Sequence, residues 1–127
     1  MLLEWIRGWL TPHPFWIRDL GKKGEFLVRR YYRRHGYHLV ARNWRHGRGE
    51  IDAIMANPFG FVFVEVKTRT WREGLRMADE LSFEQEKRLN GLAHYFMSQW
   101  DQSHPWRFEL HLVTVKGRRW TLERMRI

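Results

Sequence analysis

Two short acidic segments interrupt stretches of the chain that otherwise have the composition of buried strands. The first is Gly49-Glu50-Ile51-Asp52, and the second is Glu65-Val66-Lys67, which directly follows the run Phe61-Val62-Phe63-Val64. Aromatic and β-branched residues in such a run are typical of sheet strands. Strand alternation puts Glu65 and Lys67 on one face with Phe61 and Phe63. In the earlier strand it groups Glu50 and Asp52 with Ile54, opposite Ile51, Ala53 and Met55. Both strands therefore carry charge on a surface that their neighbours indicate is partly buried.

Asp52 and Glu65 are candidate ligands of a divalent cation. A buried carboxylate without a partner is unfavourable, so acids kept beside a lysine in such strands indicate a compensating ion. Carboxylate oxygens suit Mg²⁺ or Mn²⁺, and the peptide carbonyl of Val66 is a further oxygen donor. The ammonium of Lys67 is placed to orient water and to offset charge on a phosphate. A two-stranded ribbon with a cross-strand ion pair explains the same residues without any metal.

A wider set of segments resembles a nuclease family. These segments are Gly24-Glu25, His35-Gly36-Tyr37, Ala41-Arg42-Asn43-Trp44-Arg45, Gly49-Glu50-Ile51-Asp52, Val62-Phe63-Val64-Glu65-Val66-Lys67-Thr68-Arg69, Ala93 and Arg107-Phe108-Glu109. Together they resemble the PD-(D/E)XK signature of metal-dependent nucleases, and more narrowly the YraN family of predicted endonucleases. The resemblance implies an α/β, restriction-endonuclease-like fold with an αβββαβ core, in which helices flank a mixed central sheet. It also implies phosphodiester hydrolysis with Mg²⁺ or Mn²⁺ held by Asp52, Glu65 and the Val66 carbonyl, and with Lys67 in a catalytic role.

The resemblance adds one acid to the site and contains two departures from the family pattern. Glu25 corresponds to a first-helix carboxylate that points back toward the metal and binds a second ion or a metal-bound water. Without the resemblance, the sequence around Glu25 indicates only a solvent-exposed glutamate on a helix. Ile51 stands where the wider signature has proline, and Gln85 stands where the family has a lysine, beside Lys87. The family accepts arginine at the position of Lys67, so water positioning and charge stabilisation suit this residue better than a general-base role.

The charge of the chain favours a polyanionic partner. Its 23 Lys and Arg against 14 Asp and Glu give a net charge of +9, which fits nucleic acid but does not distinguish DNA from RNA or from an anionic membrane. For the nuclease that the resemblance implies, DNA is favoured over RNA. The predicted nucleic-acid contacts are Arg45, Arg48, Arg69, Trp71, Gln85 and Lys87, since guanidinium groups bind phosphate and an indole stacks on a base. The chain contains no cysteine, which fits the cytoplasm, and no apolar stretch approaches the roughly 20 residues of a membrane span.

Hydrophobic periodicity and turn residues predict one domain over residues 17–127 after a Trp-rich extension, residues 1–16. The predicted helices cover 1–10, 17–34 and 83–100, and the predicted strands cover 38–44, 50–56, 61–68, 107–115 and 120–124. Gly36 is expected to end the second helix and Ser82 to cap the third. The short turns between the first three strands predict an antiparallel meander, and residues 69–81 are expected to form a loop beside the site. The extension is expected to pack on its own domain, with a homodimer contact or a membrane-surface anchor as alternatives.

These features favour a metal-dependent endonuclease that acts on DNA, branched or structured DNA included. Asp52, Glu65 and Lys67 supply the chemistry, and Glu25 supports it. A non-catalytic nucleic-acid-binding module that retains the fold explains the charge equally well, although such a binder has no need of the three site residues. A scaffold or membrane-surface adaptor that uses the Trp-rich start is the third class.

Overall fold

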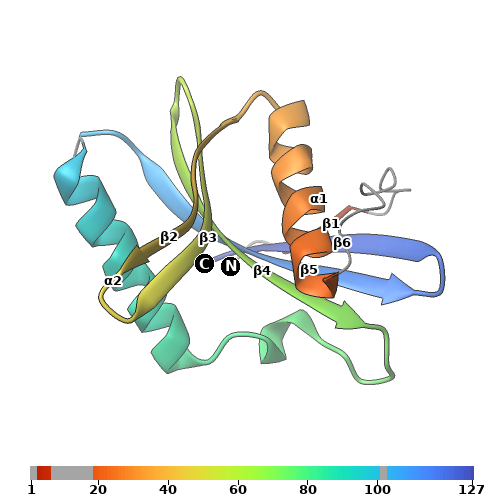
Figure 1. Ribbon diagram of the computed structural model, residues 1–127. Coiled ribbons are helices and arrows are strands. Elements are labelled where there is room, and N and C mark those ends of the chain that lie inside the picture. The colour runs from red at the N-terminus through yellow and green to blue at the C-terminus, as the bar shows by residue number, and fades with distance from the viewer. Residues whose placement is uncertain (1–2, 7–18, 101–102) are drawn as a thin grey trace.

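The structure is a computed structural model that describes residues 3–6, 19–100 and 103–127 (Figure 1). One 3-10 helix, two α-helices and six strands are present in these residues. In chain order they are β1 (Leu3–Ile6), α1 (Leu20–Arg34), β2 (His38–His46), β3 (Gly49–Asn57), β4 (Gly60–Thr70), η1 (Met77–Asp79), α2 (Phe83–Gln99), β5 (Trp106–Lys116) and β6 (Arg119–Arg126). No helix in these residues is both long and apolar enough to cross a membrane.

The strands form one mixed sheet in the order β1-β6-β5-β4-β3-β2. β2, β3 and β4 form the predicted antiparallel meander, and β5 and β6 form a second antiparallel pair. β4 and β5 are parallel, and α2 makes the crossover between them, as parallel neighbours require. The α/β class and the αβββαβ order predicted from the sequence are therefore confirmed, with β6 and β1 extending the sheet beyond that core.

Two of the helix-end signals were predicted, namely Gly36 after α1 and Ser82 before α2, whereas the cap at Asp19 was not. The Asp19 carboxylate accepts a hydrogen bond from the backbone N–H of Lys22 at 2.9 Å, and the Ser82 hydroxyl accepts one from Gln85 N–H at 3.1 Å. Such caps satisfy backbone donors that have no partner within the first turn of a helix. After α1, Gly36 adopts a φ of +85°, a conformation that favours glycine and ends the helix.

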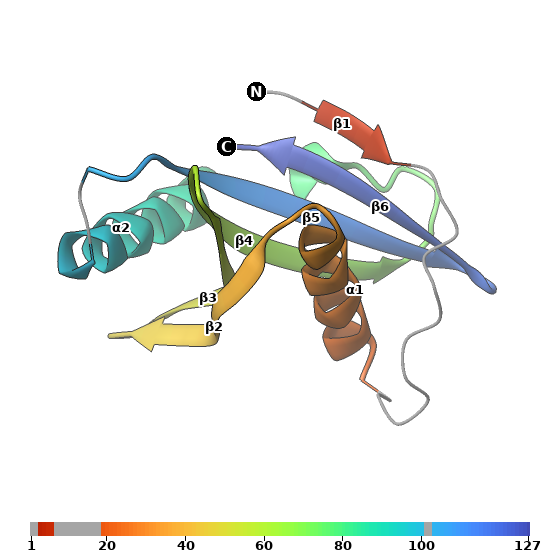
Figure 2. The ribbon, with the colours of Figure 1, turned by 90° about the horizontal axis from the view of Figure 1, so that it is seen from above.

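The two helices cover opposite faces of the sheet, as Figures 1 and 2 show. Val62 and Val64 of β4 pack with Val28 and Tyr32 of α1, whereas Phe63 packs with α2. The side chains of α2 that face the core are Leu89, Leu92, Ala93 and Phe96, as predicted. Burial of these apolar faces is the main force that holds both helices on the sheet.

Two sequence predictions are corrected. Residues 3–6 form β1, not part of a helix, and pair antiparallel with β6 from Leu3 opposite Met125 to Ile6 opposite Leu122. The edge of β6 presents unpaired backbone groups, and a strand satisfies them where a helix does not. The segment thus joins its own domain, as one reading of the sequence expected, while residues 7–18 lie outside the described residues.

The segment at 69–81 is the second correction. β4 continues to Thr70, so Arg69 belongs to the strand. Farther along, Met77 lies in η1 and is buried against Leu110, Leu112 and Met125. The remainder of the segment connects β4 to α2 as a loop, but its centre is anchored in the core.

Candidate active site

The sheet divides at the two predicted acids. The β3–β4 ladder runs from Asn57 opposite Gly60 to Ala53 opposite Val64, and Asp52 and Glu65 are the next residues along each strand. Past this point β3 pairs with β2, and β4 pairs with β5 as far as Thr70. Figure 1 shows β3 and β4 diverging below their shared hairpin. Asp52 and Glu65 therefore face each other across the opening of a fork.

The side chain of Asp52 links β3 to β4 at the point where their backbone pairing ends. Its Oδ2 accepts a hydrogen bond from the backbone N–H of Val66 at 2.8 Å, a donor that lies beyond the last β3–β4 pair. On the other side of β3, the position opposite Asp52 is Asn43, which has a φ of +49°. Strand alternation breaks here, because Ile51 packs in the same cluster as Ile54 and not on the opposite face as predicted.

Glu65 and Lys67 lie together on β4, as alternation predicted. Lys67 Nζ lies 3.6 Å from Glu65 Oε1, and Glu65 is only 8% exposed. Burial, together with the charge of Asp52, raises the pKa of Glu65 to about 8, although Lys67 opposes the shift. Burial also raises the pKa of Asp52, against the opposing effects of the Val66 N–H and Lys67. The fork therefore holds two carboxyl groups whose ionisation is unfavourable without a further cation.

Glu25 reaches the site because Gly24 brings α1 against β4. A Cβ atom on Gly24 would lie 1.8 Å from Thr68 Oγ1, so only glycine allows this approach. Glu25 is half-buried, and burial followed by the charge of Asp52 raises its pKa. Glu25 therefore lies within electrostatic range of Asp52.

The donors of this fork suit a hard divalent ion. Among residues 3–6, 19–100 and 103–127, no three Asp, Glu or His side chains form a ready-made metal cluster. Mg²⁺ needs fewer protein ligands than that, since it keeps several waters and binds through one or two carboxylates. The half-buried Asp52 and the buried Glu65 supply two carboxyl groups whose repulsion a cation would remove. The chemistry of this donor set therefore fits Mg²⁺ or Mn²⁺.

The acid at Glu50 is not part of the fork. Its Oε2 lies 3.1 Å from Nε of Arg45, in an exposed ion pair on the β2–β3 hairpin. Asp52 and Glu50 thus lie on one strand and differ in their partners, but the charge of Glu50 contributes to the raised pKa of Asp52.

The predicted nucleic-acid contacts divide into paired and unpaired side chains. Arg45 is paired with Glu50, and Arg69 lies 3.0 Å from Glu80. Trp71 is half-exposed, with Lys116 Nζ 4.0 Å above its ring. The remaining predicted contacts have no ion-pair partner among the described residues. They are Arg48 and Lys87, which are exposed, and Gln85, which is half-buried in the first turn of α2.

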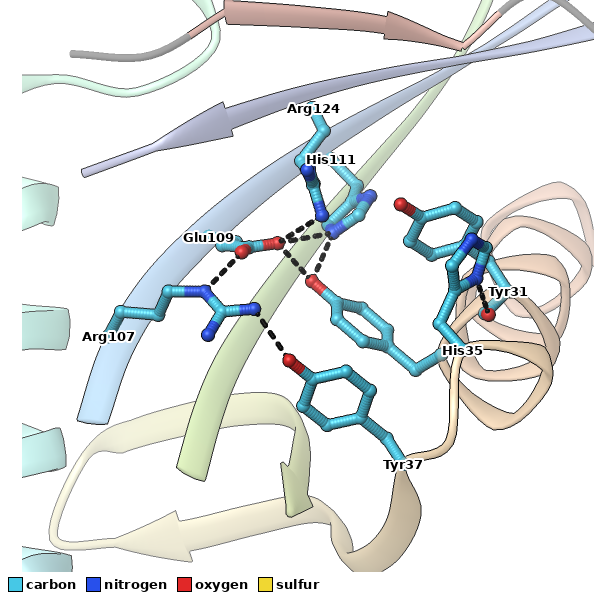
Figure 3. A network of polar contacts seen from close by, with 8 residues as sticks. Tyr31, His35, Tyr37, Arg107, Glu109, His111 and Arg124 are labelled. Carbon is cyan, nitrogen blue, oxygen red and sulfur yellow. Dashed lines mark hydrogen bonds and ion pairs between the residues drawn. The ribbon is translucent and has the colours of Figure 1, made fainter. Parts of the chain in front are cut away.

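A buried polar network beside the fork had no predicted role (Figure 3). Tyr32 of α1 donates a hydrogen bond to Glu109, and its hydroxyl oxygen lies 2.6 Å from Nε2 of His111. Arg107 binds the other Glu109 oxygen and donates to the Tyr37 hydroxyl at 2.9 Å. Glu109 and His111 pair with the β4 residues on either side of Glu65. The network therefore fixes the second half of α1 next to the site, while Gly24 fixes the first.

Burial alone would raise the pKa of Glu109. Hydrogen bonds from His111, Tyr32 and Arg107 and the charge of Arg107 outweigh burial and hold the pKa at about 2. Burial lowers the pKa of His111, which favours the neutral ring. The sequence signal for this network is two polar residues, at i and i+2, in the otherwise apolar run of β5.

Comparison with known proteins identifies similar sequences across most of the chain. Residues 24–118 match the family described as Uncharacterised protein family UPF0102. A UPF0102 protein of Ruegeria pomeroyi is 43% identical over 100 residues, which cover 77% of this chain and 80% of that protein. A UPF0102 protein of Roseiflexus castenholzii is 36% identical over 98 residues, which cover 76% of this chain and 79% of that protein.

Among solved structures, the chain is similar to Pyrococcus furiosus SfsA in complex with Ca²⁺. The identity is 14%, and the match covers 85% of this chain and 62% of that one, so this chain spans less than two thirds of the SfsA chain. The superposition is loose, with a TM-score of 0.38.

Proposed function

Because the chain belongs to UPF0102, the YraN family, and brings Asp52, Glu65 and Lys67 together at a fork in its sheet, we propose that it is a metal-dependent endonuclease. The reaction is hydrolysis of phosphodiester bonds in nucleic acid. The net charge of +9 supports a nucleic-acid substrate in general. DNA, branched or structured DNA included, is the substrate that we propose.

The observation that carries this proposal is the pair of carboxyl groups beside a lysine, of which Glu65 is buried and Asp52 is half-buried. Keeping two acids close together in a partly buried fork destabilises the fold, and a protein that only binds nucleic acid gains nothing from the arrangement. A site that loads a divalent cation needs such a pair. This contrast favours the enzyme over the non-catalytic binding module.

Each residue of the fork has a role in the proposed reaction. Asp52 and Glu65 would hold Mg²⁺ or Mn²⁺, with the Val66 carbonyl and Glu25 as further oxygen donors. When bound, the cation supplies Lewis acidity and an activated water at neutral pH. Lys67, on the same strand face as Glu65, orients the attacking water and stabilises the negative charge that develops on the phosphate. The hydrogen bond from Val66 N–H holds the Asp52 carboxylate in place.

Metal binding and cleavage measured on the same preparations test the proposal. Calorimetric titration with Mn²⁺ should show saturable binding that Asp52→Asn and Glu65→Gln abolish, because each change keeps the shape and removes the charge. With Mg²⁺ or Mn²⁺, the parent protein should cleave DNA from a panel of duplex, flapped and four-way substrates, and neither Asp52→Asn nor Glu65→Gln should cleave any of them. DNA affinity should stay near that of the parent protein in both variants.

Glu50→Gln is the matched control. It removes one carboxylate from the same strand as Asp52, at a half-exposed side chain that is paired with Arg45 and acts on Asp52 only through its charge. Metal binding and cleavage should therefore persist in this variant. Undiminished cleavage by Asp52→Asn would contradict the proposal. DNA binding without any saturable Mn²⁺ site in the parent protein would favour the binding module instead.

A further inference from the structure

Three arginines lie beside the fork on the side of the sheet that α1 covers. Arg29 and Arg33 follow Glu25 along α1 at intervals of four residues, so the three side chains form one stripe. Arg42 of β2 is paired with Ala53, which is buried in the cluster beneath α1. Directly paired residues share a face of the sheet, so Arg42 is on the α1 side. α1 packs against β2, β3 and β4, which brings the stripe and Arg42 together.

None of these arginines forms an ion pair within the described part of the chain. None of the three has a carboxylate oxygen within 4.0 Å among residues 3–6, 19–100 and 103–127. Other arginines near the site have such a partner, since Arg45 is paired with Glu50 and Arg69 with Glu80. The unpaired set therefore differs from the contacts that the sequence predicted.

Arg29 is the centre of this cluster. It is half-buried, and burial lowers its pKa, as do the nearby charges of Arg42 and Arg33, while Glu25 and Asp52 act in the opposite direction. A partly desolvated guanidinium beside two like charges is unfavourable unless an anion approaches it. Asp52 is among the charges that act on Arg29, so the arginine cluster lies within electrostatic range of the fork.

We infer that Arg29, Arg33 and Arg42 bind backbone phosphates that flank the scissile one, so that the DNA strand crosses the fork on the α1 and β2 side. This inference rests on the proposed function. Guanidinium groups bind phosphate oxygens in pairs, and phosphate would turn the mutual repulsion of the three arginines into attraction. The carboxylates and the arginines then have separate tasks, because the former hold the metal and the latter set the path of the strand.

The salt dependence of binding tests this path without any cleavage. A short fluorescein-labelled DNA duplex is titrated in EDTA with Asp52→Asn protein, and the affinity is measured by anisotropy over a salt series. Adding Arg29→Gln, Arg33→Gln and Arg42→Gln should reduce the slope of log affinity against log salt by about 2.7, since each phosphate contact contributes about 0.9. A lysine triple at the same positions keeps the charge and should keep the slope.

The matched control removes the same charge from arginines that already have acidic partners. It combines Arg45→Gln, Arg69→Gln and Arg76→Gln, whose partners are Glu50, Glu80 and Asp79. Its slope should change by less than about 1, the value of a single phosphate contact. The inference would be overturned if the triple variant at Arg29, Arg33 and Arg42 had the same salt slope as the control triple. It would also be overturned if that variant kept the slope of the Asp52→Asn protein. If the first triple does not fold, Arg42→Gln alone should lower the slope by about 0.9, and an unchanged slope would count against the site.

The result is separable from the outcome for the nuclease. If the slope falls but Asp52→Asn still cleaves, the arginine surface stands and the proposed metal chemistry fails. If Asp52→Asn abolishes cleavage but the slope does not fall, the nuclease stands and the strand does not run over these arginines. If the first triple instead weakens binding to anionic lipid vesicles and leaves the duplex slope unchanged, the surface is a membrane contact and the inference is wrong.

Discussion

Replacing Gly24 by alanine tests how α1 is seated on the sheet beside the candidate site. The new Cβ would lie 1.8 Å from Oγ1 and 3.0 Å from Cβ of Thr68, so the helix or the strand must move. Overpacking of this kind costs about 1–3 kcal/mol, whereas alanine in place of glycine inside a helix gains about 1 kcal/mol. We expect Gly24→Ala to lower the free energy of unfolding by up to about 2 kcal/mol, measured by urea denaturation.

Thr68→Ala supplies the second arm of a double-mutant cycle. The Thr68 hydroxyl is buried and has no hydrogen-bond partner among the described residues, so its removal leaves no donor or acceptor unsatisfied. In the Thr68→Ala background the closest contact of the new Cβ is gone, and Gly24→Ala should cost at least about 1 kcal/mol less. An equal cost in the two backgrounds would refute the steric explanation.

Gly91 of α2 is the internal control for this cycle. It is a helical glycine that is exposed, and a Cβ added there meets nothing within 4 Å. Gly91→Ala should therefore show the helix-propensity effect alone and raise the free energy of unfolding by about 1 kcal/mol. If Gly24→Ala lowers the free energy of unfolding and Gly91→Ala raises it, the effect at Gly24 is due to the packing of α1 and not to a general effect of alanine in a helix.

Two further predictions concern the fork and the buried network. Lys67→Ala should retain or strengthen Mn²⁺ binding but slow single-turnover cleavage by about 10²-fold or more, with partial recovery in Lys67→Arg; an unchanged rate would make Lys67 only an ion-pair partner. Glu109 has a lowered pKa of about 2 against an ordinary 4.5, so its stabilisation is present above pH 4.5 and is lost as the pH falls toward 2. At about 1.4 kcal/mol per pKa unit, Glu109→Gln should cost about 3 kcal/mol in urea denaturation at pH 7 and little near pH 2; a cost independent of pH would exclude this electrostatic origin.

The central strands, α2 and the acids of the fork were predictable because their signals are local. Charged residues in a β-branched run identify Glu65 and Lys67 without knowledge of any distant residue. Ser82 identifies the start of α2 in the same way, through the N–H groups of the turn that follows it. The assignment of Asp52 and Glu65 to adjacent strands needed only the short turn between β3 and β4.

Features that depend on distant partners were missed. The spacing of Leu2, Trp5, Ile6 and Trp9 fits a helix, but residues 3–6 pair with β6 at the opposite end of the chain. Nothing in those ten residues records that an open strand edge is available. The unpaired state of Arg29 and the hydrogen bonds of Glu109 likewise depend on contacts between α1, β2 and β5.

The fork also explains why one residue serves both structure and chemistry. Where β3 leaves β4, the N–H of Val66 loses the strand partner it would otherwise have, and the Asp52 carboxylate accepts its hydrogen bond. Asparagine keeps an acceptor for that N–H and loses only the charge, whereas alanine would leave a partly buried donor unsatisfied. The asparagine variant therefore isolates the chemical role of Asp52. The hydrogen bond to Oδ2 fixes the Asp52 carboxylate, which under the proposed function would hold the metal ion through its other oxygen.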